Sequence, residues 1–174
     1  MQETLNRAKQ IRLIIFDVDG VLTDSRLYLG DDGQEYKAFN SKDGLGMKLL
    51  QKSGVEIGII TGRTSNVVTI RMESLGIRHV YQGQRHKVPA FEELRDKLDL
   101  RNEQIAFVGD DVVDLPVMRQ VGLAITVQDA HPLVRAHAHW QSRAGGGRGA
   151  AREICELLME AQGTLGQAYE KYLR

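Results

Sequence analysis

Residues 13–20 read LIIFDVDG, an apolar run followed by two aspartates and a glycine. A short run of this kind, rich in β-branched residues and bounded by polar ones, is typical of a fully buried parallel strand. Similar runs follow at 55–60, 105–108 and 123–125, and segments with helical spacing lie at 43–52, 65–75 and 89–98. This alternation of strands and helices predicts an α/β fold with a doubly wound parallel sheet covered on both faces.

Residues 26–39, RLYLGDDGQEYKAF, interrupt the alternation between the first strand and the first helix. The Asp31-Asp32-Gly33 turn predicts a β-hairpin here, a small insertion that we expect to act as a cap. A tail from 145 to 174 consists of a glycine-rich loop and two helical segments, 150–162 and 164–173. The length of 174 residues fits one domain, so we expect a single domain over 1–174.

The composition excludes several classes of protein. The chain carries 23 Lys and Arg residues against 23 Asp and Glu residues, so it has no overall field to attract nucleic acid or an anionic membrane. Its one cysteine, Cys155, excludes an internal disulfide framework and indicates a reducing compartment. No apolar run approaches the ~20 residues that a membrane span needs. We therefore expect a cytoplasmic protein with no nucleic-acid or membrane partner.

Polar residues follow the predicted strands at the ends where ligands bind in open α/β sheets. In chain order they are Asp17 and Asp19, then Thr61, Gly62 and Arg63, then Lys87, and finally Asp110, Asp111 and Asp114. Alone, the aspartate and threonine groups could be ordinary turns or helix caps and Lys87 a solvated surface charge, but these alternatives do not readily produce all four together. Clustered carboxylates repel one another unless a cation lies among them. Oxygen ligands without nearby Cys or His favour Mg²⁺ over zinc.

The order DVDGVLTD, ITGR, a lysine and GDDVVDLP resembles the four motifs of the haloacid dehalogenase-like phosphohydrolases. The resemblance covers residues 10 to 162. The hairpin, QGQ before Lys87 and the tail SRAGGGRGAAREI are similar to one subfamily in particular. That subfamily hydrolyses 3-deoxy-D-manno-octulosonate 8-phosphate in lipopolysaccharide precursor synthesis, and the resemblance implies the same reaction and a magnesium cofactor here.

The resemblance also implies a role for each residue. Asp17 would attack phosphorus and form an aspartyl phosphate, and Asp19, with a pKa raised by acidic neighbours, would act as general acid and then general base. Thr61 and Lys87 would neutralise the phosphate oxygens. Mg²⁺ would be held by Asp17, the Asp19 main-chain carbonyl and Asp110, with Asp111 and Asp114 orienting that shell.

The residues that would bind the sugar are less fixed by the motifs. Arg63, beside Thr61 and Gly62, could pair with the carboxylate of the sugar acid. Related phosphatases for nine-carbon sugar acids tend to carry Glu at this position, so Arg63 favours the eight-carbon substrate, and the nine-carbon one is the alternative. In the tail, Gly146 and Arg148 could bind an anion, or their loop could be a flexible connection.

Two further expectations complete the prediction. An isolated two-stranded ribbon with apolar side chains is marginal in water, and relatives are tetramers, so we expect a homotetramer in which hairpins pack together. A receiver-type signalling domain also combines an α/β sheet with an acidic Mg²⁺ pocket and a phosphorylated Asp. Asp19 and the hairpin argue against that alternative, because a receiver needs neither a built-in acid nor a substrate lid.

Overall fold

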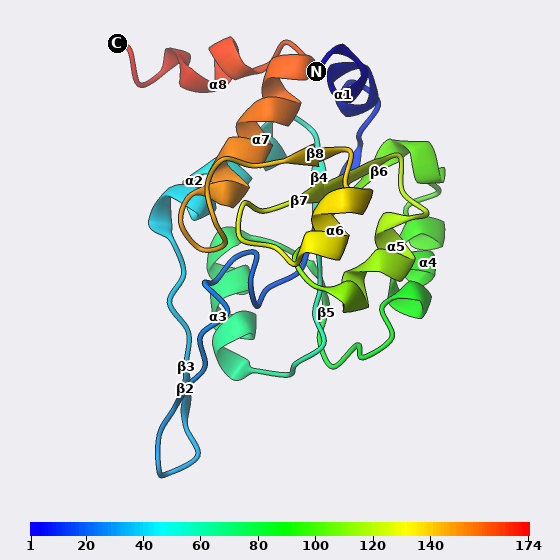
Figure 1. The fold of residues 1–174 in the computed structure, drawn as a ribbon. Helices are drawn as coiled ribbons and strands as arrows, with labels where there is room; N and C mark the ends of the chain where they lie inside the picture. The colour runs from blue at the N-terminus through cyan, green and yellow to red at the C-terminus, as the bar shows by residue number, and fades with distance from the viewer.

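A six-stranded parallel sheet forms the centre of the molecule in the computed structural model, which describes residues 1–174 (Figure 1). The strand order is β5-β4-β1-β6-β7-β8. The strands are β1 (Leu13–Phe16), β4 (Glu56–Ile60), β5 (His79–Tyr81), β6 (Ile105–Gly109), β7 (Leu123–Thr126) and β8 (Trp140–Gln141). All of their pairings are parallel, so the predicted α/β fold is confirmed.

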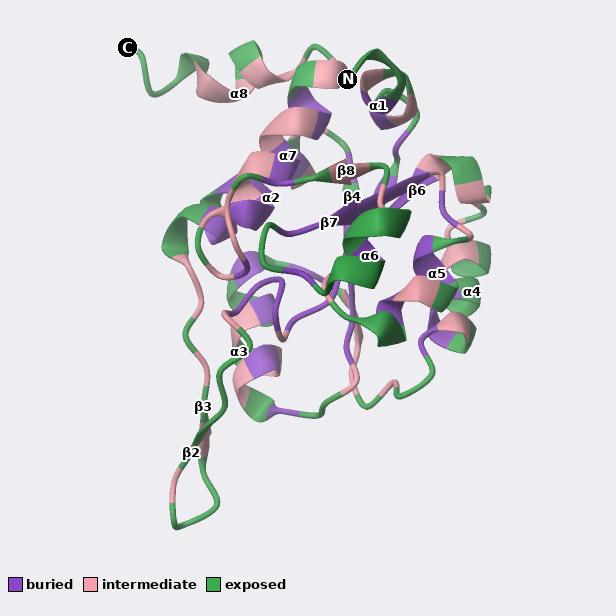
Figure 2. Ribbon diagram, viewed as in Figure 1, coloured by how far each residue is buried: buried purple, intermediate pink, exposed green.

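Helices cover both faces of this sheet, and alternate residues of β1 point to opposite sides. Ile14 and Phe16 pack in the larger buried cluster, against helices α2 (Ser41–Lys52), α3 (Asn66–Leu75) and α7 (Ala150–Ala161). Leu13 and Ile15 pack in the smaller one, against α4 (Val88–Lys97), α5 (Leu115–Met118) and α6 (Pro132–His137). The central strands are buried accordingly, so the residues that follow β1 and β6 extend from a packed core (Figure 2).

The structure adds elements that the sequence patterns did not predict. Strands β5 and β8 lie at the two edges of the sheet and are short and partly exposed, so neither has the continuous apolar run of a buried strand. Helix α1 (Gln2–Ala8) was not predicted either, whereas α8 (Leu165–Glu170) lies within the predicted helical segment 164–173, and both lie at the end of the molecule opposite the hairpin (Figure 1). No helix combines the length and apolar character that crossing a bilayer requires.

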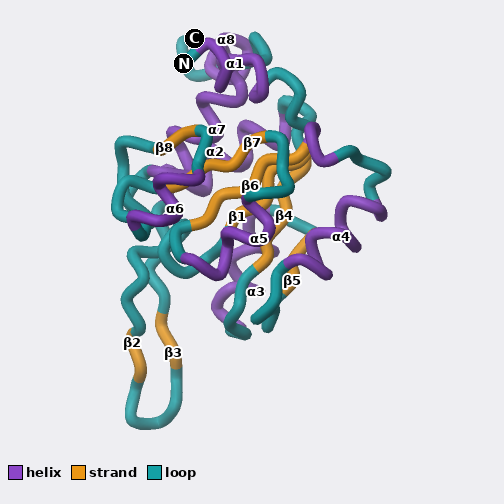
Figure 3. The backbone as a smooth tube through the Cα atoms, turned by 45° about the vertical axis from the view of Figure 1, so that its right-hand side comes forward, coloured by secondary structure: helices purple, strands orange, loops and turns teal.

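The predicted hairpin is present and extends away from the sheet (Figure 3). Its strands β2 (Tyr28–Leu29) and β3 (Glu35–Tyr36) have two residues each, and Gly30 N–H donates to the Gln34 carbonyl at 2.8 Å to close the turn. Four of its large apolar side chains, Leu27, Tyr28, Leu29 and Tyr36, are 44–66% exposed. Asn40 ends the insertion, because its side chain accepts from Lys42 N–H and caps α2.

Candidate active site

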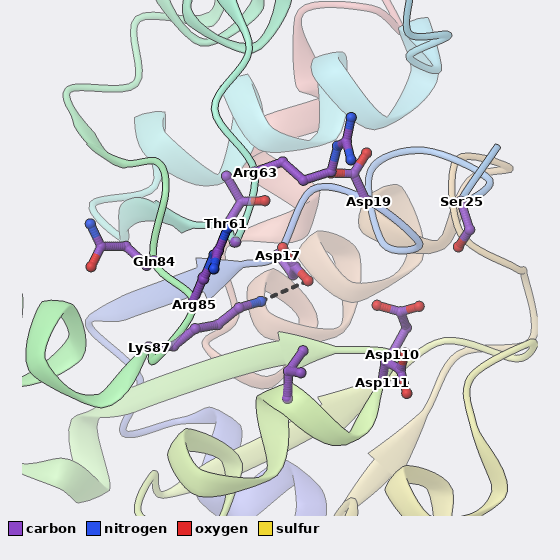
Figure 4. Close-up of a pocket in the computed structure, with 12 residues that line it drawn as sticks. Asp17, Asp19, Ser25, Thr61, Arg63, Gln84, Arg85, Lys87, Asp110 and Asp111 are labelled. Atoms are coloured by element: carbon purple, nitrogen blue, oxygen red, sulfur yellow. Dashed lines mark ion pairs between the residues drawn. The ribbon is translucent and has the colours of Figure 1, made fainter. Parts of the chain in front are cut away.

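A cavity of about 400 Å³ lies at the carboxyl ends of β1, β4 and β6 (Figure 4). It brings together the predicted residues Asp17, Asp19, Thr61, Gly62, Arg63, Lys87, Asp110 and Asp111. Ser25, Gln84, Arg85 and Val113 complete its lining. Only one of these residues is apolar, so the cavity is built for a charged or strongly polar ligand.

Asp17 lies directly after β1, where the buried strand ends, and its side chain is held on both oxygens. Val18 N–H donates to Oδ1 at 2.6 Å, and Lys87 Nζ lies 2.7 Å from Oδ2. Lys87, at the start of α4, is itself 3% exposed and also donates to Asp114 Oδ1 at 2.6 Å. In Figure 4 the Lys87 side chain reaches across to Asp17, with Asp110 on the other side of it. Asp17 is therefore a fixed, directed carboxylate.

The charges at the bottom of the cavity perturb one another. Burial raises the pKa of Asp17 to about 6, because the nearby charge of Lys87 offsets only part of the desolvation and Asp114 adds repulsion. Burial and the charges of Asp114 and Asp17 raise the pKa of Asp110 to about 8. For Lys87, burial acts to lower the pKa, but Asp17 and Asp114 outweigh it and raise the pKa above its usual value.

These carboxylates fit a divalent cation. Asp17, Asp110 and Asp114 offer oxygen atoms that all lie within 4.8 Å of one another. Lys87 neutralises Asp114 and one side of Asp17, whereas Asp110 has no cationic side chain within 4 Å. A buried carboxylate cluster with more negative than positive charge and only oxygen donors is the environment that Mg²⁺ prefers. Asp17 and Asp110 are the residues that would hold the ion.

Gly20 explains how the two acidic loops come so close. It adopts φ +92°, which side chains other than glycine rarely allow, and a Cβ there would lie 2.0 Å from Asp110 Oδ2. The turn after Asp19 therefore passes directly over Asp110. The DVDG sequence needs its glycine for this close approach as well as for the turn.

Asp111 and Asp114 shape the loop after β6. Asp114 is fully buried, and its Oδ2 accepts from Asp110 N–H at 3.0 Å and Asp111 N–H at 3.2 Å. Asp111 is exposed and accepts from Val112 N–H at 2.7 Å, which caps the 3₁₀ turn Val112–Asp114. Asp114 thus orients Asp110 and Lys87, while the Asp111 side chain serves the turn.

Asp19 differs from expectation in its neighbours. The sequence predicted acidic groups around it, but the side chain that contacts it is Lys37, from the base of the hairpin. Lys37 also lies 3.3 Å from Glu35, and Glu35 in turn lies 2.8 Å from Arg63. Arg63, predicted for the sugar carboxylate, is 46% exposed at the cavity and paired with this hairpin carboxylate. Sequence reasoning missed Lys37 and Glu35, because no motif marks a hairpin residue that folds back onto the first strand's loop.

The glycine-rich loop of the tail packs on the back of the same turn. A Cβ on Gly146 would lie 1.9 Å from the Gly20 carbonyl oxygen, and Gly147 N–H donates to the Val21 carbonyl at 3.0 Å. Gly146 N–H donates to Asp129 at 2.9 Å, so it is not free for an anion. Arg148 is exposed and does not line the cavity. In this chain the loop supports the Gly20 turn, and neither Gly146 nor Arg148 faces the cavity.

Comparison with known proteins places this site in a family. Residues 65–154 match the sequence profile of the haloacid dehalogenase-like hydrolases. The chain is also 49% identical over 166 residues to the 3-deoxy-D-manno-octulosonate 8-phosphate phosphatase of Escherichia coli K12, which covers 95% of this chain and 88% of that protein. The chain belongs to the haloacid dehalogenase-like hydrolase family.

Solved structures of other haloacid dehalogenase-like hydrolases have the same fold. The 3-deoxy-D-manno-octulosonate 8-phosphate phosphatase of Yersinia pestis is 48% identical, with a TM-score of 0.93 over 94% of this chain and 88% of that one. The enzyme of the same name from Moraxella catarrhalis, solved with a magnesium ion, a phosphate ion and a KDO molecule, is 39% identical. It has a TM-score of 0.96 and covers 100% of this chain and 99% of that one. The predicted family is confirmed, and this chain is a magnesium-dependent phosphoric monoester hydrolase.

Proposed function

We infer that this chain hydrolyses 3-deoxy-D-manno-octulosonate 8-phosphate to the free sugar acid and inorganic phosphate. The observation that carries this inference is the Moraxella catarrhalis relative, which aligns over the whole chain and holds magnesium, phosphate and KDO. The cavity supports it, since its lining combines carboxylates with Arg63, Arg85 and Lys87 for an anionic sugar. We place this reaction in lipopolysaccharide precursor synthesis, as predicted from the sequence.

In the first half of the proposed reaction, an Asp17 oxygen attacks phosphorus and the bond from phosphorus to the sugar oxygen breaks. Asp19 gives its proton to that leaving oxygen, and Asp17 becomes an aspartyl phosphate. Lys87 and Thr61, which line the cavity, would stabilise charge on the phosphate oxygens. Asp17, Asp110 and, as predicted, the main-chain carbonyl of Asp19 would hold magnesium. The ion would supply positive charge that reduces the repulsion between the Asp17 carboxylate and the substrate phosphate.

In the second half, a water attacks the phosphorus of the aspartyl phosphate. Asp19, now ionised, takes a proton from this water, phosphate leaves, and Asp17 is regenerated as a carboxylate. Asp17 is only 6% exposed and has two fixed contacts, with Val18 N–H and Lys87. These restraints keep its side chain aligned for both in-line steps. Turnover, rather than a lasting phosphoaspartate, distinguishes this function from that of a receiver domain.

Steady-state hydrolysis with Mg²⁺ tests the function directly. We expect phosphate release from the octulosonate 8-phosphate, loss of release in excess chelator, and recovery when Mg²⁺ returns. Asp17→Asn keeps the size of the side chain and removes the nucleophile, so it should abolish turnover without changing the circular dichroism spectrum. Asp19→Asn should lower kcat by about 10²–10⁴-fold, as expected for loss of a general acid. Undiminished turnover in Asp17→Asn would falsify the assignment.

The nine-carbon sugar-acid phosphate is the competing substrate. We propose that Arg63 favours the eight-carbon acid, so kcat/KM should be higher for the octulosonate 8-phosphate than for the nine-carbon phosphate. The reverse order would assign the chain to the alternative substrate while leaving the chemistry of Asp17 unchanged.

We further propose that residues 1–174 act as one hydrolase domain and assemble as a homotetramer in the cytoplasm. Support for assembly comes from the hairpin, whose side chains Leu27, Tyr28, Leu29 and Tyr36 are 44–66% exposed on a ribbon with two-residue strands. Packing hairpins around a symmetry axis would cover these side chains. A cytoplasmic location agrees with the single, buried and unpaired Cys155. Light scattering tests the assembly, and a fully active monomer would contradict it.

A further inference from the structure

The hairpin sends one side chain into the active site. Lys37 follows β3, and although its backbone is partly exposed, its side chain is 1% exposed. Its ammonium group contacts Asp19 Oδ1 and lies 3.3 Å from Glu35 Oε1. A buried ammonium group is retained only where carboxylates compensate its lost hydration, and here the two carboxylates come from different parts of the chain.

Lys37 therefore joins two segments that the sheet does not otherwise connect. Asp19 belongs to the loop after β1, and Glu35 belongs to β3 of the hairpin. Glu35 Oε1 also lies 2.8 Å from Arg63, which follows β4. Burial raises the pKa of Glu35, but hydrogen bonds from Ser65 and Arg63 and the charge of Lys37 outweigh it and lower the pKa, so Glu35 stays ionised. The result is a continuous row of alternating charges from Asp19 to Arg63.

The position of the Asp19 carboxylate matters more than that of an ordinary surface carboxylate, because its proposed role is proton transfer. Its side chain is 20% exposed at the mouth of the cavity, and Lys37 is the only cationic side chain within 4 Å of it. Proton transfer requires the donor oxygen to lie within hydrogen-bond distance of the leaving oxygen, and a misplacement of about 1 Å costs about 10²-fold in rate. Asp17 is fixed by Val18 and Lys87, whereas Asp19 has Lys37 alone.

We propose that Lys37 is a positioning residue for the Asp19 carboxylate, and that the hairpin orients the general acid and base through it. The proposal rests on the proposed function of Asp19. Lys37 itself neither touches phosphorus nor exchanges a proton in the reaction. The hairpin then contributes to the chemical step as well as to covering the substrate.

The test uses small phosphate monoesters whose leaving groups differ in their need for a proton. An ethyl or propyl phosphate must be protonated as its alkoxide leaves, whereas p-nitrophenolate leaves without help. The quantity to compare is kcat/KM, because it depends only on the steps up to and including the first irreversible one, which forms the aspartyl phosphate. Hydrolysis of that intermediate therefore does not affect the comparison. Neither small ester carries the sugar carboxylate, so changes in sugar binding do not enter.

In Lys37→Met we expect kcat/KM for the alkyl ester to fall by about 10²-fold, with a change of less than about threefold for p-nitrophenyl phosphate. Lys37→Arg keeps the charge and the reach, and should recover most of the loss for the alkyl ester. Lys42→Met is the matched control: Lys42 is exposed, lies shortly after the hairpin and has no carboxylate within 4 Å. It should leave both rates unchanged.

Three outcomes would overturn the proposal. Equal losses for both esters would mean that Lys37 only supports the hairpin fold, and unchanged rates would mean that Asp19 needs no partner. A higher kcat/KM for the alkyl ester in Lys37→Met would mean that Lys37 slows proton transfer from Asp19 instead of positioning it. Should Lys37→Met fail to fold, Lys37→Gln serves the same comparison. Failure of the proposed function is distinguishable, because the wild-type protein would then hydrolyse neither ester with Mg²⁺.

Discussion

Lys87 and Asp114 form an ion pair beneath the cavity, with Lys87 Nζ 2.6 Å from Asp114 Oδ1 and the Asp114 side chain fully buried. The other Asp114 oxygen accepts from two backbone N–H groups of the loop after β6. One carboxylate therefore fixes both the lysine that lines the cavity and the loop that carries Asp110.

The first prediction concerns the stability that this pair provides. Asp114→Ala leaves two backbone N–H groups without their acceptor and leaves the buried Lys87 ammonium group with Asp17 as its one remaining carboxylate, so it should lower the free energy of unfolding by about 3–5 kcal/mol. Urea denaturation monitored by circular dichroism measures the change. Asp96→Ala is the control, because Asp96 forms an exposed pair with Arg95 whose loss should cost less than about 1 kcal/mol. Similar values for the two variants would show that Asp114 is not a structural centre of the site.

The second prediction concerns substrate selection by Arg63. Its guanidinium lies at the cavity and is paired only with Glu35. A substrate carboxylate could therefore replace Glu35 as the partner of Arg63. Arg63→Ala should lower kcat/KM for the octulosonate 8-phosphate by about tenfold to a hundredfold, the loss expected for one charged hydrogen bond. Hydrolysis of p-nitrophenyl phosphate should change little. An equal loss on both substrates would assign Arg63 to phosphate or to the fold.

The third prediction concerns the tail loop. Gly146→Ala places a methyl group 1.9 Å from the Gly20 carbonyl, so either the loop or the turn after Asp19 must move. We expect lower kcat on both ester types and a lower melting temperature. Gly166→Ala, in α8, meets no atom within 4 Å and should leave kcat unchanged. Wild-type kinetics in Gly146→Ala would show that the loop does not support the turn.

The fourth prediction concerns pH and His139. Ala124 N–H donates to His139 Nδ1 at 2.9 Å, and burial together with the charge of Arg7 lowers the pKa of His139 below its usual value of about 6.5. Below that value the unfolded chain binds a proton that the folded chain does not. The contribution of His139 to stability is therefore complete above about pH 6.5 and is lost as the pH falls towards the folded pKa.

His139→Asn offers a side-chain oxygen to the same N–H and does not titrate. Between pH 7.5 and pH 5.5, chemical denaturation should therefore show a smaller loss of stability in this variant than in the wild-type protein. Equal losses in the two proteins would show that another group, such as His79, whose pKa burial also lowers, accounts for the dependence.

The parts of the fold that could be predicted are those set by local pattern. The run 13–16 is apolar on both sides, so it had to lie inside a covered sheet, and the motifs after each strand then had to meet at one edge. The hairpin was predictable from its Asp-Asp-Gly turn. Strands β5 and β8 were not, because a two- or three-residue edge strand is defined by its partner in the sheet and not by its own residues.

The residues of the site also fall into a group that local pattern predicts and a group that only tertiary packing determines. Asp17, Thr61, Lys87 and Asp110 were predicted to converge because strand ends fix them, and the cavity contains all four. The contacts of Lys37, Glu35 and Gly146 depend on how an insertion and a distant loop pack onto the first turn. That packing is tertiary, and no spacing in the sequence encodes it.

The docking of the 145–149 loop on the Gly20 turn has a consequence for how the enzyme matures. Asp17 and Asp19 precede β6, which pairs with β1, and the loop that rests on Gly20 in the chain, so they are synthesised before both. A nascent chain therefore carries Asp17 before it has Lys87, which contacts that side chain, or the loop that packs on Gly20. The site can therefore take its final form only after synthesis has passed the 145–149 loop.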